Sequence, residues 1–120
     1  MPNLKSHPIL TLIVLLVASA APTARAEGPT PEGVEFFEKK VRPLLVEHCY
    51  KCHSAQAGKP KGSLLLDTRD GLLKGGDTGA AVVPGDVESS RIINAVRYTD
   101  ENLQMPPDGK LSAQQIADLF

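Results

Sequence analysis

Both cysteines of the chain lie in one short stretch, Cys49-Tyr50-Lys51-Cys52-His53. Two thiols separated by two residues and followed directly by a histidine are typical of the attachment segment of c-type haem. Each thiol adds to one vinyl group of the porphyrin, and a single helical turn places the two sulfurs at the vinyl separation. The adjacent imidazole can then bind the iron from the same side. We therefore predict one covalent haem c, bound through Cys49 and Cys52, with His53 as an axial ligand.

Two other chemistries use cysteines at this spacing. A redox disulfide of the thioredoxin kind usually sits in a strand-rich α/β context, and nothing strand-rich precedes Cys49. A closed zinc site needs four ligands, and the nearby soft ligands are packed into six consecutive residues, which gives poor tetrahedral geometry. These four are His48, Cys49, Cys52 and His53. A non-haem thiol or zinc protein is thus the alternative, and it predicts a colourless product.

A second axial ligand is predicted at Met105, which is followed by Pro106 and Pro107. Thioether sulfur is a weak ligand for iron, so the loop that carries it must be stiff. The two prolines fix their own φ angles and restrict Met105 to an extended conformation. His/Met ligation raises the reduction potential and leaves no open position on the iron. The alternative is that Met105 only fills a gap in the core.

Several other polar residues are candidates for a role at the cofactor. His48 lies on the attachment side, so we interpret it as a partly buried helix residue. Candidates for contacts to the haem propionates, each equally compatible with a solvated surface position, are Arg42, Arg91, Arg97 and Tyr98. The glycines between Gly75 and Gly79 are interpreted as a turn, because no strand and no Walker lysine accompany them.

The first 26 residues have the three parts of a secretory signal peptide. A weakly basic start precedes an apolar run from Ile9, and Ala24-Arg25-Ala26 fits a cleavage site. The run is short for a membrane span, which needs roughly 20 residues, so an uncleaved anchor is the lesser alternative. Cleavage would remove two of the 13 basic residues and none of the 14 acidic ones, leaving a net charge of −3. This balance argues against nucleic acid as a partner.

The segments that must position the site read as helices and loops. Residues 27–35 are expected to form a linker and a helix start, with Thr30 as N-cap and Pro31 at the first helical position. Apolar residues at helical spacing then continue to His48, with a kink or break expected at Pro43. Further short helices are predicted from the Asp67 or Thr68 cap to Lys74, from a cap at Asp86 or Ser89, and from a capping box at 112–115.

The chain resembles the planctomycete-type cytochrome c domain from Phe36 to Leu119. The resemblance is carried by VRPLLVEHCYKCHS, KGSLLLDTRDGLLKGGDTGAAVVPGD, SSRIINAVRY and LQMPPDGKLS. It implies a mono-haem c-type cytochrome, with thioethers at Cys49 and Cys52, proximal His53 and distal Met105. In this family the domain usually opens a longer exported protein.

We therefore expect a small all-α domain over residues 36–120, with long loops around one haem that fills a sparse core. The last helix runs barely two turns to Phe120 without a C-cap, which predicts that the natural domain continues. The expected function is one-electron transfer in the periplasm or elsewhere outside the cytoplasm, by a carrier rather than an enzyme. Its partners would be redox proteins or adjoining domains. The main alternative is the electron-accepting haem module of a dehydrogenase.

Overall fold

The computed structural model describes residues 28–120. The predicted signal peptide, residues 1–26, lies outside this part of the chain. The described part is helical and contains no strand, only an isolated bridge between Gly76 and Gly79. Its α-helices are α1 (Pro31–Phe36), α2 (Arg42–His48), α3 (Arg69–Lys74), α4 (Arg91–Arg97) and α5 (Ala113–Ala117). The expected helix-dominated class is thus confirmed.

The N-terminal helical region begins and bends as its sequence predicts. The Thr30 hydroxyl accepts a hydrogen bond from the Gly33 N–H at 3.1 Å, and Pro31 occupies the first turn of α1. Between α1 and α2 lies a π-helical turn, Phe37–Val41. Pro43 has no N–H to donate, and its ring crowds the carbonyl one turn before it. A wider turn just ahead of Pro43 accommodates this ring without breaking the helix.

Helix α3 also has the predicted ends. The Thr68 hydroxyl accepts from the Gly71 N–H at 3.0 Å, so Thr68 and not Asp67 is the N-cap. Gly75 ends the helix with φ +74°, where a side chain would be strained. A Cβ at Gly75 would lie 1.8 Å from the Gly79 carbonyl oxygen, so the chain can double back only at a glycine.

The predicted N-cap of α4 was wrong by at least one residue. Asp86 and Ser89 hydrogen-bond to each other, and Ser90 holds the N-cap position. The buried Ser90 hydroxyl accepts from the Val83 N–H at 2.9 Å and donates to the Asp86 carbonyl at 2.8 Å. It therefore fixes the loop that enters α4 instead of capping the helix. The predicted capping box of α5 is confirmed, between Ser112 and Gln115.

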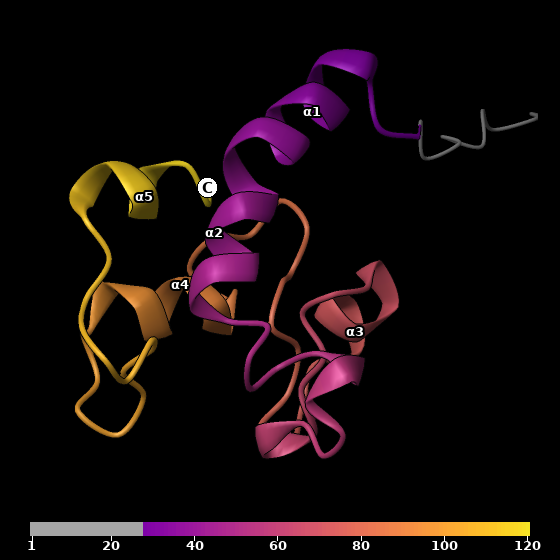
Figure 1. Cartoon of the computed structure of the whole chain (residues 1–120). Coiled ribbons are helices and arrows are strands. Elements are labelled where there is room, and N and C mark those ends of the chain that lie inside the picture. Colours follow the sequence, from indigo (N-terminus) through magenta and orange to yellow (C-terminus); the bar gives the residue numbers. More distant parts are fainter. Residues whose placement is uncertain (1–27) are drawn as a thin grey trace, which may run out of the picture.

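The hydrophobic core of the described part is small and aliphatic. Its buried members come from α2, α4 and the loops beside them, and they are Leu45, Leu66, Ala81, Ile93, Ala95, Val96 and Leu111. Figure 1 shows α1 and α2 running down the molecule, with α4 and α5 on one side and α3 on the other. Long loops make up most of the lower part, below the end of α2.

Candidate haem-binding site

The Cys49–His53 segment forms one tight turn directly after α2. The Cys49 N–H still donates to the Leu45 carbonyl, at 2.9 Å. The N–H groups of Cys52 and His53 then both donate to the Cys49 carbonyl, at 3.1 and 3.0 Å. The two thiols and the imidazole are thereby brought onto a single turn, and both sulfurs are unbonded.

The Cys49 thiol is largely shielded from water. Burial raises the pKa of this thiol to about 11, because a thiolate would lose its hydration there. Cys49 is therefore a neutral thiol near pH 7.

Two consecutive residues ahead of α3 hold the backbone around His53. The Leu66 N–H donates to the His53 carbonyl at 2.8 Å, and the Asp67 Oδ2 accepts from the Ala55 N–H at 2.9 Å. On the other side, the Lys61 N–H donates to the Cys52 carbonyl at 2.9 Å. The sequence predicts Asp67 only as a helix cap, and this backbone contact was not foreseen. One feature of the sequence could have indicated this contact. Thr68 alone suffices as the N-cap of α3, so the side chain of the adjacent Asp67 is available for another partner.

Three buried polar atoms lack hydrogen-bond partners within residues 28–120. They are the Nδ1 of His53, the Oδ1 of Asp67 and the Nε of Arg91. Buried polar groups are ordinarily paired, so such atoms mark positions where a further group can complete the site. With the two thiols and the imidazole on one turn, the donor set fits a covalently attached haem.

Met105 lies on the loop between α4 and α5. Its N–H donates to the Ala95 carbonyl at 3.1 Å, and its side chain is 38% exposed. The next residue, Pro106, is buried, and its carbonyl accepts a hydrogen bond from the Tyr98 hydroxyl. The loop is thus anchored to α4 on both sides of the Met105–Pro106 bond. Its recorded hydrogen bonds do not reach the Cys49–His53 turn, so the structure positions the two segments separately.

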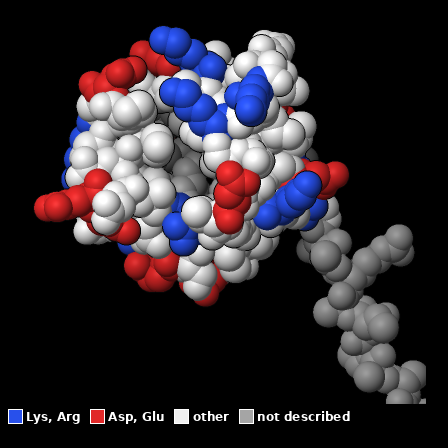
Figure 2. All heavy atoms as spheres, turned by 90° about the horizontal axis from the view of Figure 1, so that it is seen from below, with Lys and Arg blue, Asp and Glu red and all other residues white. Residues whose placement is uncertain are grey.

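The surface of the molecule is hollowed on one face. Figure 2 views the molecule from below and shows a hollow near its centre, with mostly uncharged atoms at its rim. In Figure 1, the loop between α4 and α5 lies to the left of the end of α2, and the segment after α2 lies below it and to its right.

Among the residues considered for contacts to the haem propionates, all except Arg91 have other partners. Arg42 pairs with Glu38, and Arg97 pairs with Glu88 at 2.9 Å. The half-buried His48 ends α2, with its Nε2 3.5 Å from the Gln115 side-chain nitrogen. This placement agrees with its interpretation as a helix residue. The glycines around Gly76 form a turn, as predicted, with the Gly76 N–H donating to Gly79 at 3.2 Å.

The side chains that commonly bind metal ions were compared by position. Within residues 28–120, no three side chains of His, Cys, Asp or Glu cluster closely enough to hold a metal ion. A structural zinc site takes four such ligands.

None of the helices in this range is long and apolar enough to cross a membrane.

Comparison with known protein families gives a match over the site. The family model described as planctomycete cytochrome C matches residues 49–109, which is just over half of the chain. The matched range begins at the first cysteine of the attachment turn and extends past Met105 and its two prolines. Neither a curated protein nor a solved structure gives a significant match. On the strength of the family match, the chain belongs to the planctomycete cytochrome C family.

Proposed function

We propose that this chain is an exported electron carrier with one covalent haem c. Family membership indicates a haem-binding, electron-transfer role. The observation that carries the finer assignment is the single turn on which the thiols of Cys49 and Cys52 and the imidazole of His53 lie together. When bound, haem c supplies a one-electron couple at its iron.

The residues of the turn would share the attachment between them. Cys49 and Cys52 would each form one thioether, and His53 would provide the proximal nitrogen ligand. The backbone bonds from Leu66 and to Asp67 keep the chain around His53 in place. A ligand that is held in this way needs little reorganisation when the iron changes charge, which favours fast electron transfer.

Met105 is proposed as the distal ligand. Two features support it: its loop is anchored to α4 through Ala95 and Tyr98, and its side chain is partly exposed instead of being packed in the core. A thioether ligand raises the reduction potential and closes the second axial position. With both positions filled, no substrate would bind at the iron, which supports a carrier over an enzyme.

The small core supports the same conclusion. The described part buries seven apolar residues, none of them aromatic. Domains of this size commonly need a cofactor, metal or disulfide for stability. A haem in the central hollow would provide the large apolar surface against which the helices can pack.

The proposed setting is outside the cytoplasm, because the first 26 residues read as a signal peptide and c-type haem is attached after export. The partners would be redox proteins or further domains of a longer protein, including the catalytic domain of a dehydrogenase. Sequencing of the gene beyond the Phe120 codon distinguishes a separate carrier from such a module.

The test is an absorption spectrum of the protein produced with the haem-attachment machinery and exported. We expect a c-type spectrum that stays with the polypeptide after denaturation and acid–solvent extraction. A Cys49→Ser, Cys52→Ser double variant is the matched control, and its haem should be extractable or missing. A colourless wild-type protein with two titratable thiols would contradict the proposal.

A further inference from the structure

Arg91 is the first residue of α4, and its guanidinium lacks the partners that neighbouring arginines have. Its Nε is buried and makes no hydrogen bond in the described structure. Arg42 and Arg97 form ion pairs with glutamates, whereas none of the ion pairs recorded within residues 28–120 includes Arg91. Leaving a charged donor buried without an acceptor is costly, so this side chain points to a missing anionic partner.

The backbone around Arg91 is firmly held. Ile92 donates its N–H to the Ala81 carbonyl at 3.1 Å, and the buried Ser90 hydroxyl is bonded to the preceding loop. The stem of Arg91 also passes close to Gly79, since its Cδ lies 4.0 Å from the position of a Cβ at that glycine. The guanidinium is therefore presented from a rigid base, and it is not a freely moving surface side chain.

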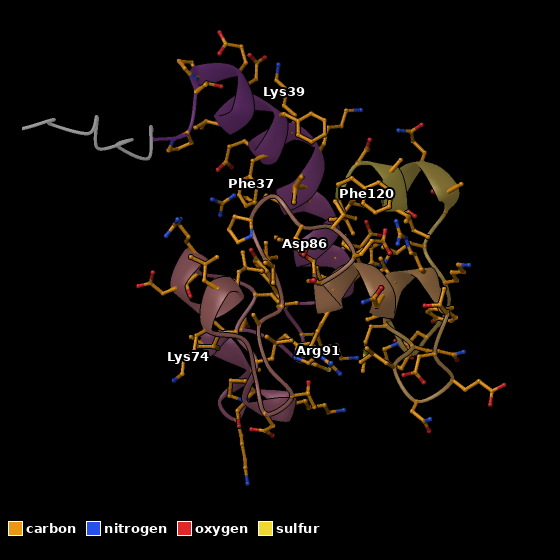
Figure 3. The ribbon with its side chains drawn as sticks, turned by 180° about the vertical axis from the view of Figure 1, so that it is seen from behind. Phe37, Lys39, Lys74, Asp86, Arg91 and Phe120 are labelled. Atoms are coloured by element: carbon orange, nitrogen blue, oxygen red, sulfur yellow. The ribbon has the colours of Figure 1, made fainter. Side chains whose placement is uncertain are left out.

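The direction of this side chain is visible in Figure 3. Arg91 lies at the lower end of α4, toward the middle of the molecule and between α4 and the loops around α3. The Gly79 turn beside the Arg91 stem is bonded in its turn to the loop that holds the attachment segment: the Asp77 N–H donates to the Gly62 carbonyl at 2.9 Å, and the Lys61 N–H donates to Cys52.

We infer that Arg91 binds a carboxylate of the haem and fixes the cofactor's orientation in the hollow. The inference rests on the proposed function. The two propionates are the anionic groups of haem, and a guanidinium matches a carboxylate with paired N–H donors. Arg91 is chosen from the four sequence candidates because Arg42 and Arg97 are already paired with glutamates and the Tyr98 hydroxyl donates to Pro106. Arg91 acts here as a cofactor-positioning residue.

The test compares the reduction potentials of the wild-type holoprotein and of Arg91→Gln, Arg91→Lys and Arg97→Gln. Removing the positive charge leaves the carboxylate uncompensated, which stabilises the more positive, oxidised iron. Arg91→Gln should therefore lower the potential, corresponding to a roughly three- to tenfold smaller equilibrium constant for reduction. Arg91→Lys keeps the charge and should recover most of this loss. Arg97→Gln, which removes a surface ion pair, should leave the potential close to that of the wild type.

A second measurement needs no variant. Carbon-13 labelling of the haem propionates allows each carboxylate to be titrated by NMR in the wild-type holoprotein. Pairing with a guanidinium should keep one propionate ionised to a lower pH than an unpaired carboxyl group. If both propionates titrate as unpaired groups, or if Arg91→Gln has the wild-type potential, the inference is wrong while the haem assignment stands. A wild-type protein without covalent haem would overturn both.

Discussion

The Tyr98 hydroxyl donates a hydrogen bond to the backbone carbonyl of Pro106, directly after Met105. Tyr98 is also the residue at which α4 ends, with φ +59°. The end of one helix is therefore tied to the loop that carries the proposed distal ligand. Because Pro106 is buried and the Met105 N–H is bonded to Ala95, the loop has three points of attachment around one side chain.

The first prediction tests this attachment with Tyr98→Phe, which keeps the ring and removes the hydroxyl. Loss of one partly buried hydrogen bond should lower the free energy of unfolding by roughly 0.5–1.5 kcal/mol. It should also increase the fraction of protein in which Met105 is detached from the iron. Denaturant unfolding measures the first effect, and binding of an added external ligand to the ferric holoprotein measures the second. Unchanged stability and ligand affinity would show that the hydroxyl does not hold the loop.

Met105→Ala tests the distal ligand itself. Removing the thioether should lower the reduction potential and open the second axial position to small ligands such as imidazole. Met105→His is the informative companion, because it should close the position again while keeping the potential low. An alanine variant that has the wild-type potential and no added ligand affinity would mean that Met105 does not bind the iron.

Asp67→Ala tests the backbone support of the proximal side. This substitution removes an exposed hydrogen bond whose acceptor water can partly replace, and we expect a loss of about 0.5–1.5 kcal/mol in the free energy of unfolding. Asp70→Ala, at an exposed position in the first turn of α3, is the control and should cost less than about 1 kcal/mol. Thermal or denaturant unfolding of the two holoproteins gives the comparison. Equal losses would argue against a special role for Asp67.

The haem-free chain, produced without the attachment machinery, should unfold with little cooperativity, because its small aliphatic core lacks a central partner. The Cys49 thiol provides a direct readout. In an ordered chain, burial holds the pKa of this thiol at about 11, so its alkylation rate would rise only toward that pH. In a loosened chain, the rate should follow an ordinary thiol pKa of about 8.5. If the alkylation rates give a Cys49 pKa of about 11 and the haem-free chain also shows a sharp thermal transition, this prediction is wrong.

The features that the sequence predicted correctly are those set by nearby residues. Thr30, Thr68 and Ser112 each cap a helix through an N–H only three residues away, and such pairs are visible in the sequence. Pro43 likewise marks the irregular turn ahead of it. Family membership was also predicted from motifs in the chain and is confirmed by the family match.

The features that sequence reasoning missed depend on how loops fold back. Asp67 bonds to Ala55, twelve residues earlier, and Ser90 bonds to the Val83 loop, seven residues earlier. Both are good cap residues by type, and their local sequences favour several partners equally. Only the path of the loop decides between these partners. The roles assigned to Cys49, Cys52, His53 and Met105 stay predictions, because they concern bonds to the cofactor.

The short span of the bonds at the proposed site bears on how the domain folds. The His53 side is closed by contacts to Leu66 and Asp67, and the Met105 side by contacts to Ala95 and Tyr98. Each side is thus a locally closed loop, and loops of this length carry a small entropic cost of closure. The His53 loop and the Met105 loop can therefore fold independently of each other. Such units of low contact order are expected to fold rapidly. In the proposed holoprotein, the bonds that join distant parts of the chain around the site would pass through the haem.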